Sequence, residues 1–522
     1  MLRSAVAGLI AVALFLAAAG RSAPAARAAA LSLRVQRRDG DGRAVVERVS
    51  LNAKKTAIVV VDMWDRHWCT TYTARVGNLV PRMNRTLAAA RRLGIQVVFA
   101  PSDVLAPYKD APQRKAMRAI PPRALPKKVG FNPPGPPGGR DCCECGPDRP
   151  CKSRAVWTRQ HGDLKIAPGD LIADCNNGGE LLRLCGHRGI DTLVYMGVAS
   201  NMCVLYRGCG LRNMKSYGLT AYFVSDLVQA ITANGCDPAS KKPDANFTPA
   251  EGTARVQRYL ERHVAPSLRS RQILAAAEPG GDKRPHVAFV IAEQEYGSRD
   301  TLPAFAREHL GKDFRCTFAH ASPRDRNHVT GLEALYDADL LVLSMRRRML
   351  TVGQMDHLEH YIRSGFPVVA LRVSVVPFQV RPRKRPGGRV IWERFDREVL
   401  GCNYRSYDAR SRKTGCDVWP VDAAKGHPIL RGLEARGFHS PAWLYRQKPL
   451  AKTCTLLMAG RWAKDQPAEP VAWTNVYRGG RVFYTTLGHP GDFRIPAFNR
   501  MLVNAIRWAL GAEAPPATKP AD

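Results

Sequence analysis

Two residues of the N-terminal half stand where α/β proteins usually place their chemistry. Asp62 directly follows the apolar run Thr56–Val61 (TAIVVV), which has the pattern of a strand buried on both faces. A carboxylate beside a buried strand costs free energy unless it is paired or used in catalysis. Cys203 follows a predicted strand, Thr192–Met196, and a glycine-containing turn that leads into a helix.

A cysteine at a helix N-terminus has a thiolate that the helix dipole and the exposed backbone N–H groups stabilise. The same N–H groups can form an oxyanion hole. We therefore expect Cys203 to be a nucleophile and Asp62 to be its base. The alternatives are an aspartate that only caps a helix and a cysteine that is only a small buried side chain.

Both residues lie in distinctive segments, TAIVVVDMWDRHWC and GIDTLVYMGVASNMCV, and the segment YFVSDLV follows later in the chain. With these segments, about residues 50–265 resemble the isochorismatase-like cysteine hydrolases. The resemblance implies a catalytic trio of Asp, Lys and Cys that hydrolyses an amide or related C–N bond of a small molecule through a thioester. It also implies a non-proline cis peptide at Val198–Ala199, in the turn that carries Ala199, Ser200 and Met202 near the oxyanion.

Two features depart from that family pattern. The usual lysine motif is missing, so Lys165 is the nearest candidate for the third catalytic residue and Arg159 is the second. The Asp-x-His pair with which nicotinamidase members hold zinc is replaced by Ser102-Asp103-Val104-Leu105. We expect no catalytic metal and no cofactor.

The C-terminal half contains four distinctive segments, YDADLLVLSMRRRMLT, HYIRSGFPVVALR, GHPILRGL and EPVAWTNVYRGGRVFYTTLGHPGDF. With these segments it resembles the trehalose-utilisation (ThuA-like) domains, which share the class I glutamine-amidotransferase fold. The turn that would hold an amidotransferase nucleophile contains Arg372 and Ser374 but no cysteine. We expect a pocket formed by Arg372, Ser374 and His489 that binds a small molecule such as a saccharide, without glutaminase activity.

Four of the 14 cysteines lie close together in a Pro/Gly-rich insertion at residues 122–151. They are Cys142, Cys143, Cys145 and Cys151. Disulfides, a bound metal such as zinc and free thiols are all compatible with this spacing, because no second CxxC pair or HxxxH motif completes a recognised module.

Alternating strands and helices predict an α/β protein with two three-layer α/β/α domains and mostly parallel sheets. Strands are expected at Ile95–Ala100 and Ala221–Val224, and in the second half at His286–Ile291, Leu340–Leu343, Pro367–Leu371 and Arg481–Thr485. We place a signal peptide at residues 1–28, a hydrolase domain at 50–265, a linker at 270–284 and a ThuA-like domain at 285–512.

The N-terminal segment predicts export to the periplasm or the extracellular space. Arg3 is followed by an apolar run, Leu9–Ala19, and by small residues at Ala26–Ala28 that suit cleavage. That run is short for a membrane span, so no stable membrane insertion is expected.

The composition bears on binding partners and on alternative functions. Lys and Arg (79) exceed Asp and Glu (45), which gives a net charge of +34. The basic residues are scattered and form no nucleic-acid motif, so we expect no nucleic-acid partner, while a homo-oligomer is compatible with the sequence. The alternatives to a hydrolase are a sugar-processing or sugar-binding protein acting through the second domain, and a non-catalytic exported binding protein.

Overall fold

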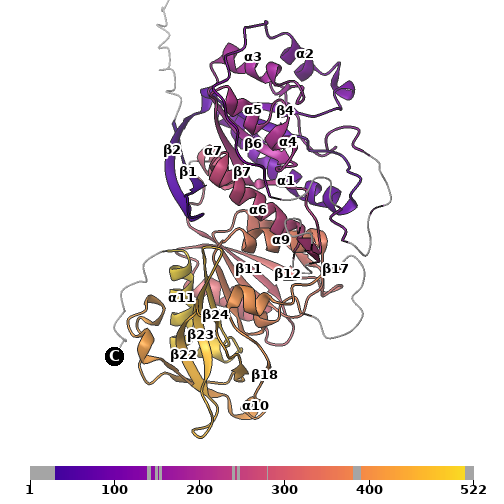
Figure 1. The fold of residues 1–522 in the computed structure, drawn as a ribbon. Coiled ribbons are helices and arrows are strands. Elements are labelled where there is room, and N and C mark those ends of the chain that lie inside the picture. The colour runs from indigo at the N-terminus through magenta and orange to yellow at the C-terminus, as the bar shows by residue number, and fades with distance from the viewer. Residues whose placement is uncertain are drawn as a thin grey trace, which may run out of the picture.

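The protein folds into two α/β halves, each built around one large sheet (Figure 1). The computed structural model describes residues 30–137, 143–146, 151, 156–237, 242–243, 247–278, 280–379 and 389–511. The predicted signal peptide, 1–28, and Cys142 lie outside the described residues. No helix within the described ranges is long and apolar enough to cross a bilayer.

The N-terminal half contains an eight-stranded sheet of order β2-β1-β10-β7-β6-β3-β4-β5. Its elements are β1 (Ala30–Arg38), β2 (Ala44–Asn52), β3 (Thr56–Val61), α1 (Thr70–Arg92), β4 (Gln96–Ala100), α2 (Pro112–Arg118), β5 (Leu171–Ile172), α3 (Gly178–Arg188), β6 (Thr192–Val198), α4 (Cys203–Tyr206), α5 (Leu211–Ser216), β7 (Thr220–Gln229), β8 (Cys236–Asp237), β9 (Lys242–Pro243), α6 (Pro249–His263), β10 (Ser267–Leu268) and α7 (Ser270–Ala277).

Six of these strands, from β10 to β5, run parallel to their neighbours. The predicted α/β class is confirmed, and the predicted strands of this half coincide with β3, β4, β6 and β7. All residues of β3 and β6 are buried, because a parallel sheet covered by helices hides both faces of its strands.

A hairpin of β1 and β2 extends this sheet beyond the predicted start of the domain at residue 50. β1 pairs antiparallel with both β10 and β2. Its residues Leu31, Leu33 and Val35 are buried and alternate with exposed neighbours, which is the period of a strand with one covered face. The sheet of the first half therefore includes this hairpin.

The C-terminal half contains a ten-stranded sheet of order β13-β12-β11-β14-β16-β24-β23-β22-β19-β20. Its elements are β11 (His286–Ala292), α8 (Ser298–His309), β12 (Arg315–Ala321), β13 (Val329–Thr330), β14 (Leu340–Met345), β15 (Leu350–Thr351), α9 (Val352–Arg363), β16 (Val368–Leu371), β17 (Arg389–Val390), β18 (Ser406–Tyr407), α10 (Ser411–Thr414), β19 (Cys416–Pro420), β20 (Phe438–Ser440), β21 (Tyr445–Arg446), β22 (Thr455–Arg461), β23 (Glu469–Tyr477), β24 (Gly480–Thr485) and α11 (Pro496–Ala509).

The predicted strands of this half are confirmed as β11, β14, β16 and β24. Together with β12 they form the parallel part of the sheet. The strands from β23 to β20 join antiparallel to this part. Separate hydrophobic clusters cover the two faces of the sheet, as expected for a three-layer domain.

The two halves share a buried, charged interface. Within the predicted linker, 270–284, residues Ser270–Ala277 form helix α7, which packs on α1. Helices α1 and α6 contact α9 of the second half (Figure 1). Across this junction Arg75 pairs with Asp356 at 2.9 Å and Arg363 with Glu251 at 3.4 Å.

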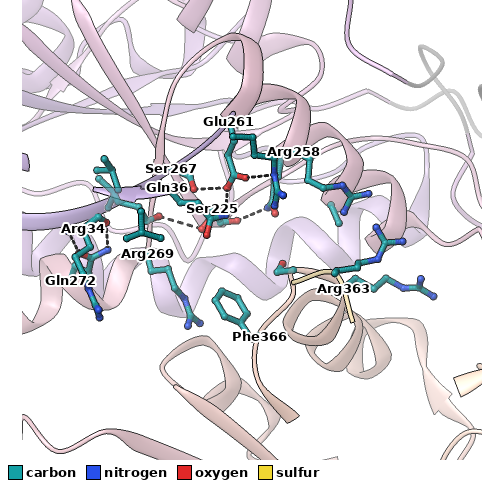
Figure 2. A pocket seen from close by; sticks show the side chains of 18 of the residues that line it. Arg34, Gln36, Ser225, Arg258, Glu261, Ser267, Arg269, Gln272, Arg363 and Phe366 are labelled. Carbon is teal, nitrogen blue, oxygen red and sulfur yellow. Dashed lines mark hydrogen bonds and ion pairs between the residues drawn. The ribbon is translucent and has the colours of Figure 1, made fainter. Parts of the chain in front are cut away.

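A pocket opens at the same junction (Figure 2). Its walls include Gln36 of β1, Arg258 and Glu261 of α6, and Arg363 and Phe366 of the second half. Neither Asp62 nor Cys203 lines this pocket. The chemistry predicted for that pair therefore belongs to a different part of the molecule.

Candidate functional site

Asp62 and Cys203 meet at the carboxyl edge of the first sheet. β3 and β6 are adjacent parallel strands, so the residues that follow them lie at the same edge. Asp62 adopts a positive φ of 46° directly after β3, and Cys203 is the first residue of α4. The peptide between Val198 and Ala199 is cis, so the cis bond that the family resemblance implied is confirmed.

The thiol of Cys203 lies close enough to the Asp62 carboxylate for each group to shift the pKa of the other. Burial raises the pKa of Asp62, although hydrogen bonds from Ser102 and Cys203 and the charge of Arg207 oppose that rise. Burial, followed by the negative charge of Asp62, raises the pKa of Cys203 to about 12. The resting pair is thus a neutral thiol beside a carboxylate that is more basic than an ordinary aspartate.

Ser102 fixes the orientation of that carboxylate from the neighbouring strand. Its backbone N–H and its hydroxyl each donate to Asp62 at 2.5 Å. Ser102 follows β4, the neighbour of β3 on the other side from β6. Ser102, one of the residues found in place of the zinc-binding Asp-x-His pair, therefore orients the carboxylate of Asp62.

Arg207 is the cation that reaches Cys203. The charge of its guanidinium lowers the pKa of Cys203 against the effect of burial. Two hydrogen bonds hold the side chain, one to Asn176 at 2.7 Å and one to Asp103 at 3.1 Å. Sequence reasoning missed this residue. Its position one helical turn after Cys203 was the available signal.

A disulfide fixes the turn that carries Arg207. Cys175, next to Asn176, is bonded to Cys209, two residues after Arg207. The amide of Cys209 also donates to the carbonyl of Cys175 at 3.0 Å. The disulfide thus lies beside the site, whereas the described cysteines of the 122–151 insertion are not disulfide-bonded.

The structure does not bring Lys165 to this pair, whereas the backbone of Arg159 is bonded to that of Asp65, three residues after Asp62. Lys165 is exposed, and its backbone is bonded to Asn84 and Arg91 in the second half of α1. That end of α1 leads into β4, so Lys165 lies toward the amino edge of the sheet, opposite Cys203. Arg159 is also exposed. The predicted role of Lys165 therefore has no geometric support, and Arg207 occupies the position of a third member.

Two of the amides predicted for the oxyanion hole already have backbone acceptors. Ser200 N–H donates to the carbonyl of Gln229 at 2.8 Å, and Met202 N–H donates to that of Ala199 at 3.0 Å. For the amide of Cys203 no backbone acceptor is found within the described part of the chain. This amide, at the start of α4, is the donor best placed to meet a developing oxyanion.

Aromatic side chains and unpartnered polar groups surround the pair. Trp64, two residues after Asp62, stacks on Trp157 with ring centroids 4.2 Å apart. Among the described residues, Trp64 Nε1, both amide atoms of Gln160 and the hydroxyl of Ser200 are buried without a hydrogen-bond partner. Buried polar groups are normally satisfied, so these atoms are available to a polar substrate or to water.

We predict that Arg207→Gln slows alkylation of Cys203 by iodoacetamide at pH 8. The variant removes the positive charge that lowers the pKa of the thiol, and only the thiolate reacts. The rate should fall about tenfold for each unit by which the pKa rises. Peptide mass spectrometry of the Cys203 peptide gives the rate for this residue alone.

The matched control for this prediction is Arg48→Gln, because Arg48 is exposed on β2. It removes the same charge from the chain but leaves the site intact. Equal alkylation rates in the Arg207 and Arg48 variants would show that the arginine does not act on Cys203.

In the second half, Arg372 and His489 lie together but Ser374 does not join them. Arg372 is buried at the end of β16 with a positive φ of 44°, and its guanidinium lies 4.2 Å from the ring centre of Tyr296. His489 packs edge-on to the same ring, with centroids 6.3 Å apart. Burial, and then the charge of Arg372, lowers the pKa of His489.

Ser374 is turned into the core. Its hydroxyl donates to the Leu343 carbonyl at 2.7 Å and accepts from the Met345 amide at 3.1 Å. Both bonds hold the turn after β16. The small hollow beside Arg372 is lined by Tyr296, Ser344 and Gly488, among others, and by neither Ser374 nor His489.

Comparisons with known proteins give one family match and several distant structural likenesses. Residues 288–509 match the ThuA family model, described as trehalose utilisation, whereas a search of curated proteins found no match. A ThuA-like protein from Bacteroides uniformis is 17% identical, with a TM-score of 0.34, over 45% of this chain and 95% of that chain.

Two solved hydrolase structures are similar to the chain at a comparable level. A cysteine hydrolase from Pseudomonas syringae pv. phaseolicola is 16% identical, with a TM-score of 0.28, over 44% of this chain and 96% of that chain. An isochorismatase family protein from Burkholderia thailandensis is 15% identical, with a TM-score of 0.26, over 43% of this chain and 96% of that chain.

Proposed function

We propose that the N-terminal half is a cysteine hydrolase that cleaves an amide or a related C–N bond of a small molecule. The observation that carries the proposal is that the buried Cys203 thiol, at the start of α4, lies beside the buried Asp62 carboxylate and the Arg207 guanidinium. In nucleophilic catalysis the nucleophile and its base typically lie within hydrogen-bond reach, and a third group orients the base. Ser102 supplies that orientation.

In the proposed reaction the Cys203 sulfur attacks the carbonyl carbon while its proton passes to Asp62. The raised pKa of Asp62 suits a group that must take up a proton and return it. Collapse of the tetrahedral intermediate breaks the C–N bond, and Asp62 returns the proton to the leaving nitrogen. Water, deprotonated by Asp62, then attacks the thioester, releases the acid and restores the thiol.

The environment of the pair favours a small, polar substrate. Cys203 is only 5% exposed, so a polymer cannot reach it without rearrangement. The unpartnered groups of Trp64, Gln160 and Ser200 offer donors and acceptors for polar substrate atoms. Such groups fix orientation in small-molecule sites, where most of the lining is apolar.

The direct test is acid-quenched mass spectrometry of the full chain with a panel of small amides, ureas and carbamoyl compounds. A substrate should leave an acyl group on the Cys203 peptide, and Cys203→Ala should neither hydrolyse the compound nor carry the adduct. Cys316→Ser, at a free thiol of the second half, is the matched control. Hydrolysis that persists in Cys203→Ala would refute the proposal.

A second candidate function is binding of a saccharide by the C-terminal half. Arg372 lies within 6 Å of three aromatic rings, those of Tyr296, Trp443 and Tyr445, and residues 288–509 match the trehalose-utilisation model. Aromatic faces and a guanidinium are groups that hold sugar rings and their hydroxyls. Calorimetric titration with mono- and disaccharides tests this idea, and heats equal in wild type and Trp443→Ala would count against it.

We also propose that the protein is exported. The support is the apolar run Leu9–Ala19 with its charged start and small-residue cleavage region. The Cys175–Cys209 disulfide is consistent with an oxidising compartment. N-terminal sequencing of the mature protein from its native host would locate the cleavage point.

A further inference from the structure

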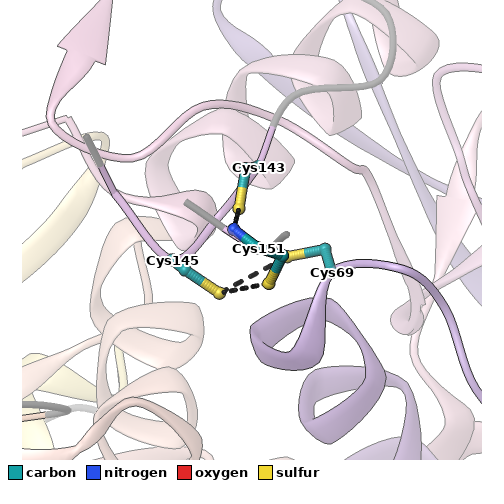
Figure 3. Close-up of side chains that lie close together, drawn as sticks. All are labelled: Cys69, Cys143, Cys145 and Cys151. Atoms are coloured by element: carbon teal, nitrogen blue, oxygen red, sulfur yellow. Dashed lines mark hydrogen bonds between the residues drawn. The ribbon is translucent and has the colours of Figure 1, made fainter. Parts of the chain in front are cut away.

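Four cysteine sulfurs meet where the 122–151 insertion returns to the start of α1. Cys69 directly precedes α1, and Cys143, Cys145 and Cys151 come from the insertion (Figure 3). All four Sγ atoms lie within 4.8 Å of one another. Cys69 lies 74 residues before Cys143, so the spacing within the insertion did not reveal that it joins this cluster.

The distances between the sulfurs fit a shared ion better than covalent pairs. Cys145 Sγ lies 3.3 Å from Cys151 Sγ and 3.9 Å from Cys69 Sγ, and none of the four is disulfide-bonded. A disulfide needs about 2.05 Å between its sulfurs. Four thiolates around one zinc ion, with Zn–S bonds of about 2.3 Å, place neighbouring sulfurs about 3.8 Å apart in a tetrahedron.

Hydrogen-bond donors point at the sulfurs from the surrounding backbone. The amide of Glu144 donates to Cys69 at 3.3 Å, that of Thr70 to Cys151 at 3.4 Å and that of Cys151 to Cys143 at 3.3 Å. The Thr71 hydroxyl lies 3.2 Å from the sulfur of Cys145. Donors of this kind stabilise the negative charge on thiolate ligands and orient them, whereas neutral thiols gain little from them because their sulfur is a weak acceptor.

We propose that Cys69, Cys143, Cys145 and Cys151 form a structural zinc site. Thiolate ligands in a tetrahedral set of four favour zinc among the common metals. All four positions are filled by protein, so no position remains for water or substrate, which is the property of a structural site. Four thiolates around one zinc ion carry a net negative charge. The partial positive charge at the N-terminus of the 23-residue helix α1 stabilises that negative charge.

The site connects the insertion to the catalytic edge and to the domain interface. Cys69 is seven residues after Asp62, so the ion fixes the end of the segment that begins with the base. Glu144, between two ligands, is fully buried and accepts two bonds from Arg75 at 2.8 Å, and Arg75 also reaches Asp356 of the second half. The zinc site does not depend on the proposed hydrolase activity.

The test is metal analysis of the purified full chain, expressed with its signal peptide removed and in the presence of zinc. We expect one zinc per chain by plasma mass spectrometry, and less than a tenth of that in Cys145→Ser and in Cys151→Ser. Cys316→Ser, at a free cysteine far along the chain in the second half, should keep full occupancy. A chelator should lower the melting temperature of the wild type and of Cys316→Ser alike.

Cobalt replacement decides the question even if the serine variants fail to fold. The wild type refilled with Co²⁺ should show sulfur-to-cobalt charge-transfer absorption and the strong visible bands of a tetrahedral site, and zinc should bleach both. A reduced wild type that binds neither metal would overturn the proposal. Disulfides among these four cysteines in the native protein, or an iron-containing chromophore, would overturn it as well.

Discussion

Replacing Cys203 with alanine is expected to reduce hydrolysis to the uncatalysed rate, and Asp62→Asn to lower kcat/KM by about 10²–10⁴-fold, the usual contribution of a general base. Both residues are buried at the same sheet edge, and each shifts the pKa of the other. Because nucleophile and base act as a unit, the double variant should lose little more than Cys203→Ala alone. Steady-state kinetics with the compound found in the adduct screen measures these effects.

The controls separate catalysis from folding. Asp62→Asn nearly preserves the side-chain volume, and Cys203→Ala removes only one sulfur atom. The melting temperatures of both variants should therefore stay close to that of the wild type. A Cys203→Ala variant that keeps most of the activity would remove this residue from the mechanism. A loss of activity that follows a loss of folded protein would make the two residues structural.

The pH profile of kcat/KM should have an acid limb above the ordinary aspartate value of 3.8. Burial raises the pKa of Asp62, and below that pKa the carboxyl is protonated and cannot accept the thiol proton. Activity therefore rises as the pH increases through it. An acid limb at or below the ordinary value would show that another group is the base.

Replacing Arg75 with methionine is expected to destabilise the protein by about 3–5 kcal/mol, the cost of leaving buried charges without their partner. Arg75 is 1% exposed and pairs with Glu144 on one side and with Asp356 of the second half on the other. Burial raises the pKa of Glu144 to about 7 even with Arg75 beside it. Chemical denaturation of the full chain, followed by circular dichroism, measures the change.

The destabilisation caused by Arg75→Met should be larger at high pH than at low pH. A carboxyl whose pKa is raised on folding favours the folded state at low pH and opposes it as the pH rises through the folded value. Without Arg75 the pKa of Glu144 rises further, so the Arg75→Met variant should be least stable above pH 7 and recover part of the difference in acid.

The control for this prediction is Arg85→Met, on the same helix. The side chain of Arg85 is 56% exposed, and its ion pair with Asp337 is long, at 3.9 Å. Exposed ion pairs contribute about 0–1 kcal/mol. Similar losses in the two variants would show that the buried network does not join the halves. The same network leads us to expect that residues 30–278, expressed without the second half, are poorly soluble.

Several elements followed from local pattern alone. β3 begins and ends at the residues predicted for it, since a continuous apolar run between polar neighbours has few other buried conformations. β1 was missed although Leu31, Leu33 and Val35 alternate correctly, because charged residues on its exposed face hide the period. Its position is decided by pairing with β10, more than 200 residues away.

The candidate site divides in the same way. The sequence by itself determined that Asp62 and Cys203 stand at strand ends, because burial and turn signals are local properties of the chain. Only the tertiary structure decided that Arg207, rather than Lys165, reaches the sulfur, that Cys175 bonds to Cys209 and that Cys69 joins the cysteines of the insertion. Such contacts depend on how strands order in the sheet and how loops return to it, and spacing along a sequence carries no record of either.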